Sequence, residues 1–146
     1  MERRTLLQSI PVAALFPGSL LAGVERENGG VAPESATVYE LRVYQVFPGK
    51  LPDLLARFRD HTVKLFDKHG MKSIAYWTPV DEPKKSNTLI YVLQHPSREA
   101  ATANWKAFVE DPEWINVRNK SEANGQLVEK LESTFMALTD FSPHLK

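Results

Sequence analysis

The sequence predicts an α+β domain with a ferredoxin-like fold, in which an antiparallel sheet carries both of its helices on one face. Segments with an apolar residue at every second position, typical of strands, alternate with segments whose apolar residues follow a helical period. Their order is strand, helix, strand, strand, helix, strand, which is the β-α-β-β-α-β pattern of that fold. The expected strands span residues 37–47, 72–80, 88–94 and 132–141, and the expected helices span 51–68 and 97–110.

The first strand has two different faces. A face that carries Glu and Arg should look onto water or a lined polar cavity, so we expect it to point away from the helices. That second face carries Glu40, Arg42 and Tyr44, whereas the first carries Tyr39, Leu41 and Val43.

The two helices have recognisable ends. Pro52 lies in the first turn of the 51–68 segment, where its missing N–H is harmless, and Gly70 can adopt the positive φ that ends a helix. In the second helix Ser97 is a candidate N-cap, and the break follows at Asp111, which precedes Pro112. The stretch 113–131 reads as short helical turns or loop.

Two helices on one face leave the other face of the sheet uncovered. We expect that face to carry aromatic residues of the strands, Tyr44 among them. A large exposed apolar patch marks an interface. The sequence therefore predicts a homodimer in which two sheets meet face to face with twofold symmetry.

Composition indicates one soluble globular domain. The chain has 146 residues, 18 basic and 18 acidic side chains and no cysteine. The zero net charge argues against nucleic acid as a partner, and the lack of cysteine excludes disulfides, thiol catalysis and thiolate zinc sites.

The first 36 residues differ from the rest of the chain. Arg3 and Arg4 precede an apolar stretch of 10–24, which is too short for a stable membrane span and is typical of an export signal. The order resembles bacterial twin-arginine signals. We therefore expect an export signal at 1–24, a flexible linker at 25–36 and the folded domain at 37–146, in the periplasm or outside the cell. The alternatives are an uncleaved anchor and an unexported protein with an apolar tail.

Five short motifs of the domain resemble the NIPSNAP family. They are VYELRVY at 38–44, PGK at 48–50, KHG at 68–70, YWT at 76–78 and DPEW at 111–114. The resemblance covers residues 38–143 and implies a dimeric α+β barrel built from two ferredoxin-like sheets. It implies no established reaction.

Five residues are candidates for a ligand site lining that barrel: Glu40, Arg42, Tyr44, Trp77 and Tyr91. An Arg beside a phenol can hold a carboxylate or polarise a carbonyl, and the aromatic rings can stack on a flat ligand. The alternative interpretation is structural. Glu40 and Arg42 would then form an internal or intersubunit ion pair, and the aromatic residues would be core.

Other catalytic features are missing from the sequence. The four histidines, His61, His69, His95 and His144, lack metal-binding spacing, so we expect no metal site. We expect His61 to be half-buried beside the apolar stripe and Trp114 to plug the end of the second helix. No nucleophile motif or phosphate loop occurs. We expect no cofactor; haem, which related barrels bind, would have His95 as the only suggestive ligand.

Two functions remain open at this point. The first is a homodimer that binds a small aromatic or carboxylate-bearing molecule in the barrel, with a cofactor-free oxygenase-like reaction as its catalytic form. The second is a non-catalytic interaction or assembly module whose barrel is filled by side chains.

Overall fold

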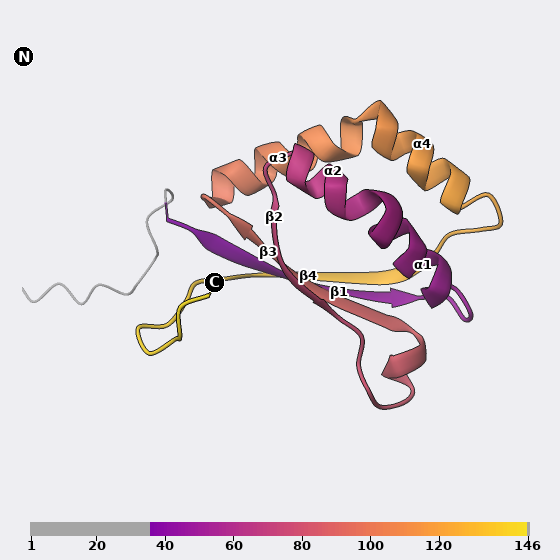
Figure 1. Ribbon diagram of the computed structural model, residues 1–146, viewed down its shortest axis with the longest axis horizontal. Coiled ribbons are helices and arrows are strands. Elements are labelled where there is room, and N and C mark those ends of the chain that lie inside the picture. Colours follow the sequence, from indigo (N-terminus) through magenta and orange to yellow (C-terminus); the bar gives the residue numbers. More distant parts are fainter. Residues whose placement is uncertain (1–35, 146) are drawn as a thin grey trace, which may run out of the picture. The chain divides into compact units, whose positions relative to one another are not determined.

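The computed structural model describes residues 36–145 and confirms the ferredoxin-like fold (Figure 1). Four antiparallel strands form one sheet in the order β2-β3-β1-β4, and the helices lie on one face of it. The strands are β1 Val38–Val46, β2 Lys72–Trp77, β3 Thr88–His95 and β4 Val128–Met136. The helices are α1 Leu51–Arg57, η1 Phe58–Thr62, α2 Val63–Lys68, η2 Lys84–Ser86, α3 Arg98–Glu110 and α4 Pro112–Ser121.

The C-terminal third differs from the sequence prediction. The last strand lies earlier than the predicted 132–141, and the stretch read as turns or loop contains the regular helix α4. β4 is an edge strand whose side chains are mostly exposed, so its sequence lacks the alternation that marks a half-buried strand. Asp111 is the N-cap of α4, and its carboxylate accepts a hydrogen bond from the Glu113 N–H at 2.8 Å. An N-cap followed by proline is a helix start, and that signal was present in the sequence.

The first helix runs from Leu51 to Lys68 as predicted, but it contains one π-helical turn. In that turn the N–H of Val63 donates to the carbonyl of Phe58, five residues back. The Thr62 hydroxyl donates to the carbonyl of Arg57 at 3.2 Å, which compensates for the disturbed ladder. Such turns are rare and are frequently found at functional sites.

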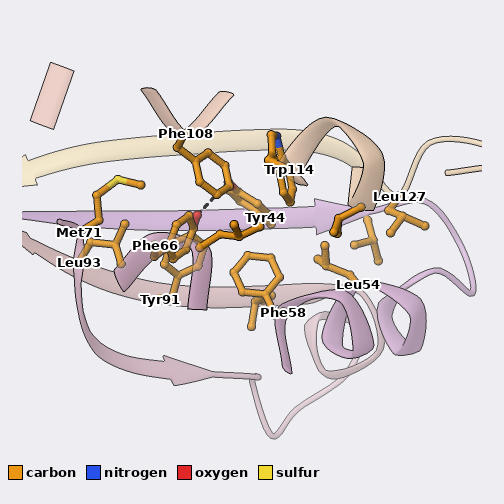
Figure 2. Close-up of a cluster of buried hydrophobic side chains, with 14 of the residues drawn as sticks. Tyr44, Leu54, Phe58, Phe66, Met71, Tyr91, Leu93, Phe108, Trp114 and Leu127 are labelled. Atoms are coloured by element: carbon orange, nitrogen blue, oxygen red, sulfur yellow. Dashed lines mark hydrogen bonds between the residues drawn. The ribbon is translucent and has the colours of Figure 1, made fainter. Parts of the chain in front are cut away.

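The hydrophobic core fills the space between the sheet and the helices (Figure 2). Phe58 and Phe66 reach down from the first helix to Tyr91 on β3, with ring centroids 5.3 and 5.8 Å from it. Phe108 of α3 packs on Trp114 of α4 at 4.6 Å. Trp114 is 9 % exposed, so the expectation that it plugs the helix end is confirmed.

The prediction about the faces of β1 was wrong. Glu40, Arg42 and Tyr44 lie beneath the helices, and Glu40 is only 1 % exposed. The apolar residues on the opposite face, Tyr39 and Leu41 among them, are only partly buried. The rule that charge points away from a core failed because the charged groups find partners under the helices, as described below.

The uncovered face of the sheet is apolar around Trp77 and carries the Lys130–Glu132 ion pair on β4. Trp77, 49 % exposed, lies on this face. A hollow of about 360 Å³ is lined there by Tyr39, Ile74, Trp77, Val92, Met136, Ala137, Leu138, Thr139, Ser142 and Leu145. None of the helices between residues 36 and 145 is long and apolar enough to cross a membrane. The predicted export signal and linker lie outside the residues that the structure describes.

Candidate functional site

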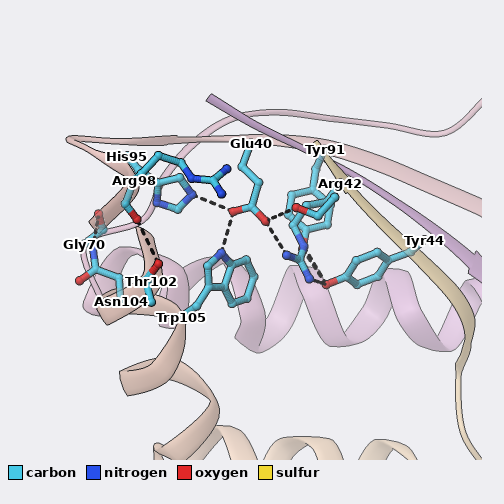
Figure 3. A network of polar contacts seen from close by, with 11 residues as sticks. Glu40, Arg42, Tyr44, Gly70, Tyr91, His95, Arg98, Thr102, Asn104 and Trp105 are labelled. Atoms are coloured by element: carbon cyan, nitrogen blue, oxygen red, sulfur yellow. Dashed lines mark hydrogen bonds and ion pairs between the residues drawn. The ribbon is translucent and has the colours of Figure 1, made fainter. Parts of the chain in front are cut away.

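A buried carboxylate, Glu40, is the centre of a polar cluster between the sheet and α3 (Figure 3). Its oxygens accept hydrogen bonds from four side chains. The donors are Arg42 Nη1 at 2.5 Å, Trp105 Nε1 at 2.6 Å, Ser133 Oγ at 2.7 Å and His95 Nε2 at 2.9 Å. This set satisfies both oxygens of the carboxylate, which is the condition for burying a charge.

The strand register brings these donors together. Glu40 and Arg42 alternate along β1, the inner neighbour of both β3 and β4. Arg42 lies opposite Ser133 on β4 and Tyr91 on β3. Trp105 reaches the cluster from α3, because it lies on the face of that helix that turns toward Phe66, with ring centroids 5.4 Å apart. The cluster therefore joins three strands and one helix.

Hydrogen bonding keeps Glu40 ionised. Burial alone would raise its pKa, but hydrogen bonds from His95, Trp105, Arg42 and Ser133 outweigh burial and lower the pKa to about 2. Since an ionised carboxylate only accepts hydrogen bonds, His95 donates through Nε2. His95 Nδ1 is buried and has no hydrogen-bond partner within residues 36–145.

Arg42 links the carboxylate to two phenols. Its Nη2 and Nε donate to the Tyr44 hydroxyl at 3.1 and 3.3 Å, and the Tyr91 hydroxyl donates to the same oxygen at 2.8 Å. The guanidinium also stacks on the ring of Trp105, 4.1 Å from its centroid. Burial and the neighbouring Tyr44 raise the pKa of Tyr91 well above its usual value, so Tyr91 remains a donor.

The cluster reaches the surface beside β4. The Arg42 side chain is 12 % exposed, and Ser133, which bonds to the same carboxylate, is exposed. Leu131, the register partner of Tyr44, is 46 % exposed. The side chains of β4 are mostly exposed, so the cluster is open to solvent on this side.

Of the five residues expected to line a site, the structure brings four together. Glu40, Arg42, Tyr44 and Tyr91 form one hydrogen-bonded chain beneath the helices (Figure 3). Trp77 is separate from them, on the uncovered face of the sheet. The internal Glu40–Arg42 ion pair of the structural interpretation is present.

Sequence reasoning missed three members of the cluster: His95, Trp105 and Ser133. His95 was considered only as a haem ligand, and its Nε2 is instead hydrogen-bonded to Glu40. Coordination of iron by Nε2 would break that bond. The period of α3 placed Trp105 on the core side, but no sequence signal indicated that its N–H meets Glu40.

The other histidines lie apart from this cluster. His61 is exposed, so the prediction that it is half-buried was wrong. His69, at the end of α2, contacts Asp111 with 2.7 Å between Nε2 and Oδ2. Among residues 36–145 no group of three or more His, Asp or Glu side chains is arranged to hold a metal ion.

Comparison with protein families decides the identity of the domain. The NIPSNAP family model matches residues 39–143. The chain belongs to the NIPSNAP family.

Solved structures support the same fold. An uncharacterised NIPSNAP-like domain protein from Burkholderia xenovorans superimposes with a TM-score of 0.65 at 17 % identity, over 77 % of this chain and 93 % of that one. A NIPSNAP family protein of unknown function from Agrobacterium tumefaciens gives 0.63 at 21 % identity, over 78 % and 97 %. SnoaB, a cofactor-independent oxygenase from Streptomyces nogalater, gives 0.50 at 12 % identity, over 75 % and 99 %. No curated protein matches the sequence.

In this NIPSNAP domain the DPEW motif is structural. Asp111 caps α4 and also accepts a hydrogen bond from Lys68 Nζ at 2.8 Å, so it ties the end of α2 to the start of α4. The cation and the hydrogen bond from His69 hold the pKa of Asp111 below its usual range. Trp114 then packs into the core, with the guanidinium of Arg57 5.1 Å from its ring. This motif therefore contributes to the packing of the helices.

Proposed function

We propose that this NIPSNAP domain is a homodimer that binds a small carboxylate-bearing or aromatic molecule at Arg42 and Tyr44. The observation that carries the proposal is the position of the Arg42 guanidinium, which is fixed by Glu40 and Trp105 and still reaches the surface beside β4. A held guanidinium next to a phenol suits a planar anion, because both supply directed donors at low entropic cost.

The hydrogen-bond directions support this choice of ligand. The Tyr44 oxygen already accepts bonds from Arg42 and Tyr91. Among residues 36–145 the Tyr44 hydroxyl donates to no side-chain acceptor, so its own hydrogen is available for a ligand oxygen. The ring of Trp105, only partly buried, offers a surface for an aromatic group.

The dimer part of the proposal rests on the uncovered sheet face. Trp77, Ile74 and Val92 form an apolar surface that a second sheet of the same kind would cover. Two sheets that meet in this way enclose a barrel, the arrangement that the family resemblance implies. Arg42 and Tyr44 would then lie in each subunit between its own sheet and helices, outside the barrel.

The catalytic form of the proposal is an oxygenase-like reaction without a cofactor. Its support is the fold shared with SnoaB, described as a cofactor-independent oxygenase. At 12 % identity that likeness carries the fold alone, so the reaction type must be measured on this chain. Oxygen uptake that depends on a bound aromatic substrate would support it.

The second candidate function is a non-catalytic assembly module. One observation favours it: the Glu40 carboxylate is saturated by four donors from the chain itself. A purely structural role, in which the cluster holds β1, β3, β4 and α3 together, is sufficient to explain these contacts. Under this candidate the Arg42 contacts are purely structural and no ligand binds.

Native mass spectrometry of the gently purified protein tests both candidates. A dimer that carries additional mass supports the binding protein and gives the mass of its ligand. A bare dimer favours the assembly module, and a monomer at micromolar concentration overturns the dimer.

Thermal-shift titration with benzoate and other aromatic carboxylates then tests the site itself. We expect the shift to disappear in Arg42→Gln and to persist in Arg59→Gln, which removes an exposed arginine elsewhere. Equal loss in both variants would contradict a site at Arg42.

We also propose that the protein is exported. The support is the Arg3-Arg4 pair before a short apolar stretch, read from the sequence. Cell fractionation of the tagged protein, with Arg3 and Arg4 replaced by lysine in a matched variant, tests this. Export of the wild type and its loss in the variant would support a twin-arginine route.

A further inference from the structure

A second cavity lies between the first helix and α4, apart from the Arg42 site. Its volume is about 490 Å³. Its walls are one face of α1 and η1 and the facing side of α4. The lining residues are Asp53, Ala56, Arg57, Asp60, His61, Asn116, Val117, Lys120, Ser121 and Asn124.

Arg57 is the buried cation of this cavity, and it has few partners. The residue is 6 % exposed. Only its Nη1 makes side-chain hydrogen bonds within residues 36–145, to Ser121 Oγ and Glu122 Oε1, and both are long at 3.3 Å. Its Nε is buried without a partner. A guanidinium has five N–H donors, so Arg57 is short of acceptors, and an additional anionic group would satisfy it.

The cavity is lined by charged side chains of both signs. Asp60, in the π turn, and Asp53, on α1, line the same cavity as Arg57. No salt bridge to Asp60 forms within residues 36–145. Lys120 lines the wall formed by α4, where it adds a second cation. A ligand in this cavity therefore meets two cations, Arg57 and Lys120, and two carboxylates, Asp53 and Asp60.

We propose that this cavity binds a small zwitterion with a carboxylate and an ammonium group a few ångströms apart, as in a free α-amino acid. The ligand carboxylate lies between Arg57 and Lys120, and its ammonium lies at Asp60. A simple anion would be repelled by Asp53 and Asp60, which share the lining, and a simple cation would be repelled by Arg57 and Lys120. A molecule with both charges matches both signs.

The π turn bears on the same proposal. It begins directly after Arg57 and contains Asp60 and His61, so the helix is widened where it lines the cavity. Burial of Arg57 lowers its pKa, although Glu122 opposes that shift. A ligand carboxylate would favour the charged guanidinium further.

Isothermal titration calorimetry of the full chain with the standard amino acids tests the proposal. We expect saturable binding of at least one amino acid. Its N-acetyl derivative, which lacks the ammonium, and its amide, which lacks the carboxylate, should each bind about tenfold more weakly or worse, because each loses a charge-assisted hydrogen bond. No saturable binding of any amino acid at millimolar concentration, or equal binding of the derivatives, would overturn the proposal.

Variants locate the site. Asp60→Asn and Lys120→Gln change exposed side chains, so they should leave the fold intact and weaken binding about tenfold each. Asp67→Asn and Arg118→Gln are the matched controls, since they remove the same kinds of charge from α2 and α4 outside the cavity. Equal effects of the controls would overturn the site. Because none of these residues contacts Arg42 or Tyr44, failure of the Arg42 proposal leaves this result interpretable.

Discussion

The two faces of β1 carry side chains of different polarity. Under the helices, β1 presents a carboxylate and a guanidinium that are both largely removed from water. On the uncovered face the same strand presents Tyr39, Leu41 and Val43, which are only partly buried. On β1 the charged face is thus the inner one and the apolar face is the one left open, while β4 adds the exposed Lys130–Glu132 ion pair to that open face.

The difference lies in the number of partners. Burial of a lone carboxylate costs several kcal/mol, and complete hydrogen bonding offsets that cost. Glu40 has four donors within its own chain. No helix between residues 36 and 145 crosses the opposite face of β1, where Tyr39, Leu41 and Val43 are only partly buried. The inner face is thus satisfied within the described domain, whereas the proposed dimer would cover the open one.

The largest expected effect concerns the open face. If two such faces meet, Val92→Asp buries an unpaired charge at the interface and should weaken the dimer about a hundredfold or more. Analytical ultracentrifugation over a concentration series measures the effect. Ala103→Asp, on the exposed side of α3, is the control and should leave association unchanged. A wild-type protein that sediments as a monomer would contradict the proposal that a second copy covers the open face of the sheet.

The next largest effect concerns the face of the sheet beneath the helices, where the Glu40 cluster lies. Glu40→Gln removes the charge that Arg42, His95 and Trp105 share, and leaves Arg42 with an unpaired charge. We expect a loss of about 3 kcal/mol in the free energy of unfolding, from urea titration.

Glu132→Gln is the matched control for this substitution. Glu132 makes an exposed ion pair with Lys130 at 2.7 Å on the edge strand β4. Such pairs contribute little because water screens them, so the urea midpoint should stay at the wild-type value. Equal midpoints for both variants would mean that the Glu40 cluster contributes nothing to stability.

Acid titration sharpens the same point. The pKa of Glu40 is lowered from 4.5 to about 2 in the folded protein. A lowered carboxyl pKa stabilises the fold above the unfolded value, and the contribution is lost as the pH falls from about 4.5 to about 2. We expect this group to account for about 3 kcal/mol of stability lost in that window. In Glu40→Gln the free energy of unfolding should fall less between pH 4.5 and pH 2 than in the wild type. An unchanged fall would mean that other carboxylates dominate the loss of stability in acid.

The sequence predicted the elements of the fold better than their orientation. Period and capping residues gave both long helices and the strand order, because each depends on local spacing. The inner and outer faces of β1 could not be assigned in the same way. The residues of β1 alternate between the two faces, and the pattern does not say which face lies beneath the helices. That depends on His95, Trp105 and Ser133, which lie 55, 65 and 93 residues from Glu40 in the chain.

The same limit applies to the candidate site. Arg42, Tyr44 and Tyr91 were selected as residue types suited to a ligand, and strand pairing does bring them together. Trp77 was selected for the same reason but faces the other side, since a step of one residue along a strand reverses the direction of the side chain. The cavity at Arg57 had no sequence signal, because it depends on the packing of two helices that are distant in sequence.

The smallest effect tests whether α3 holds Trp105 in place through its first turn. The Ser97 hydroxyl caps α3 by accepting a hydrogen bond from the Ala100 N–H at 3.0 Å. Ser97→Ala should lower the free energy of unfolding by about 1 kcal/mol, while Ser97→Asp, which can also cap, should retain most of it. Trp105 lies two turns further along the helix, so the loss should be confined to hydrogen exchange in the first turn of α3. The loss of stability between pH 4.5 and pH 2 that we assign to Glu40 should then be the same in Ser97→Ala as in the wild type. If that loss disappears in Ser97→Ala, the Glu40 cluster depends on the first turn of α3 as well as on its four hydrogen-bond donors.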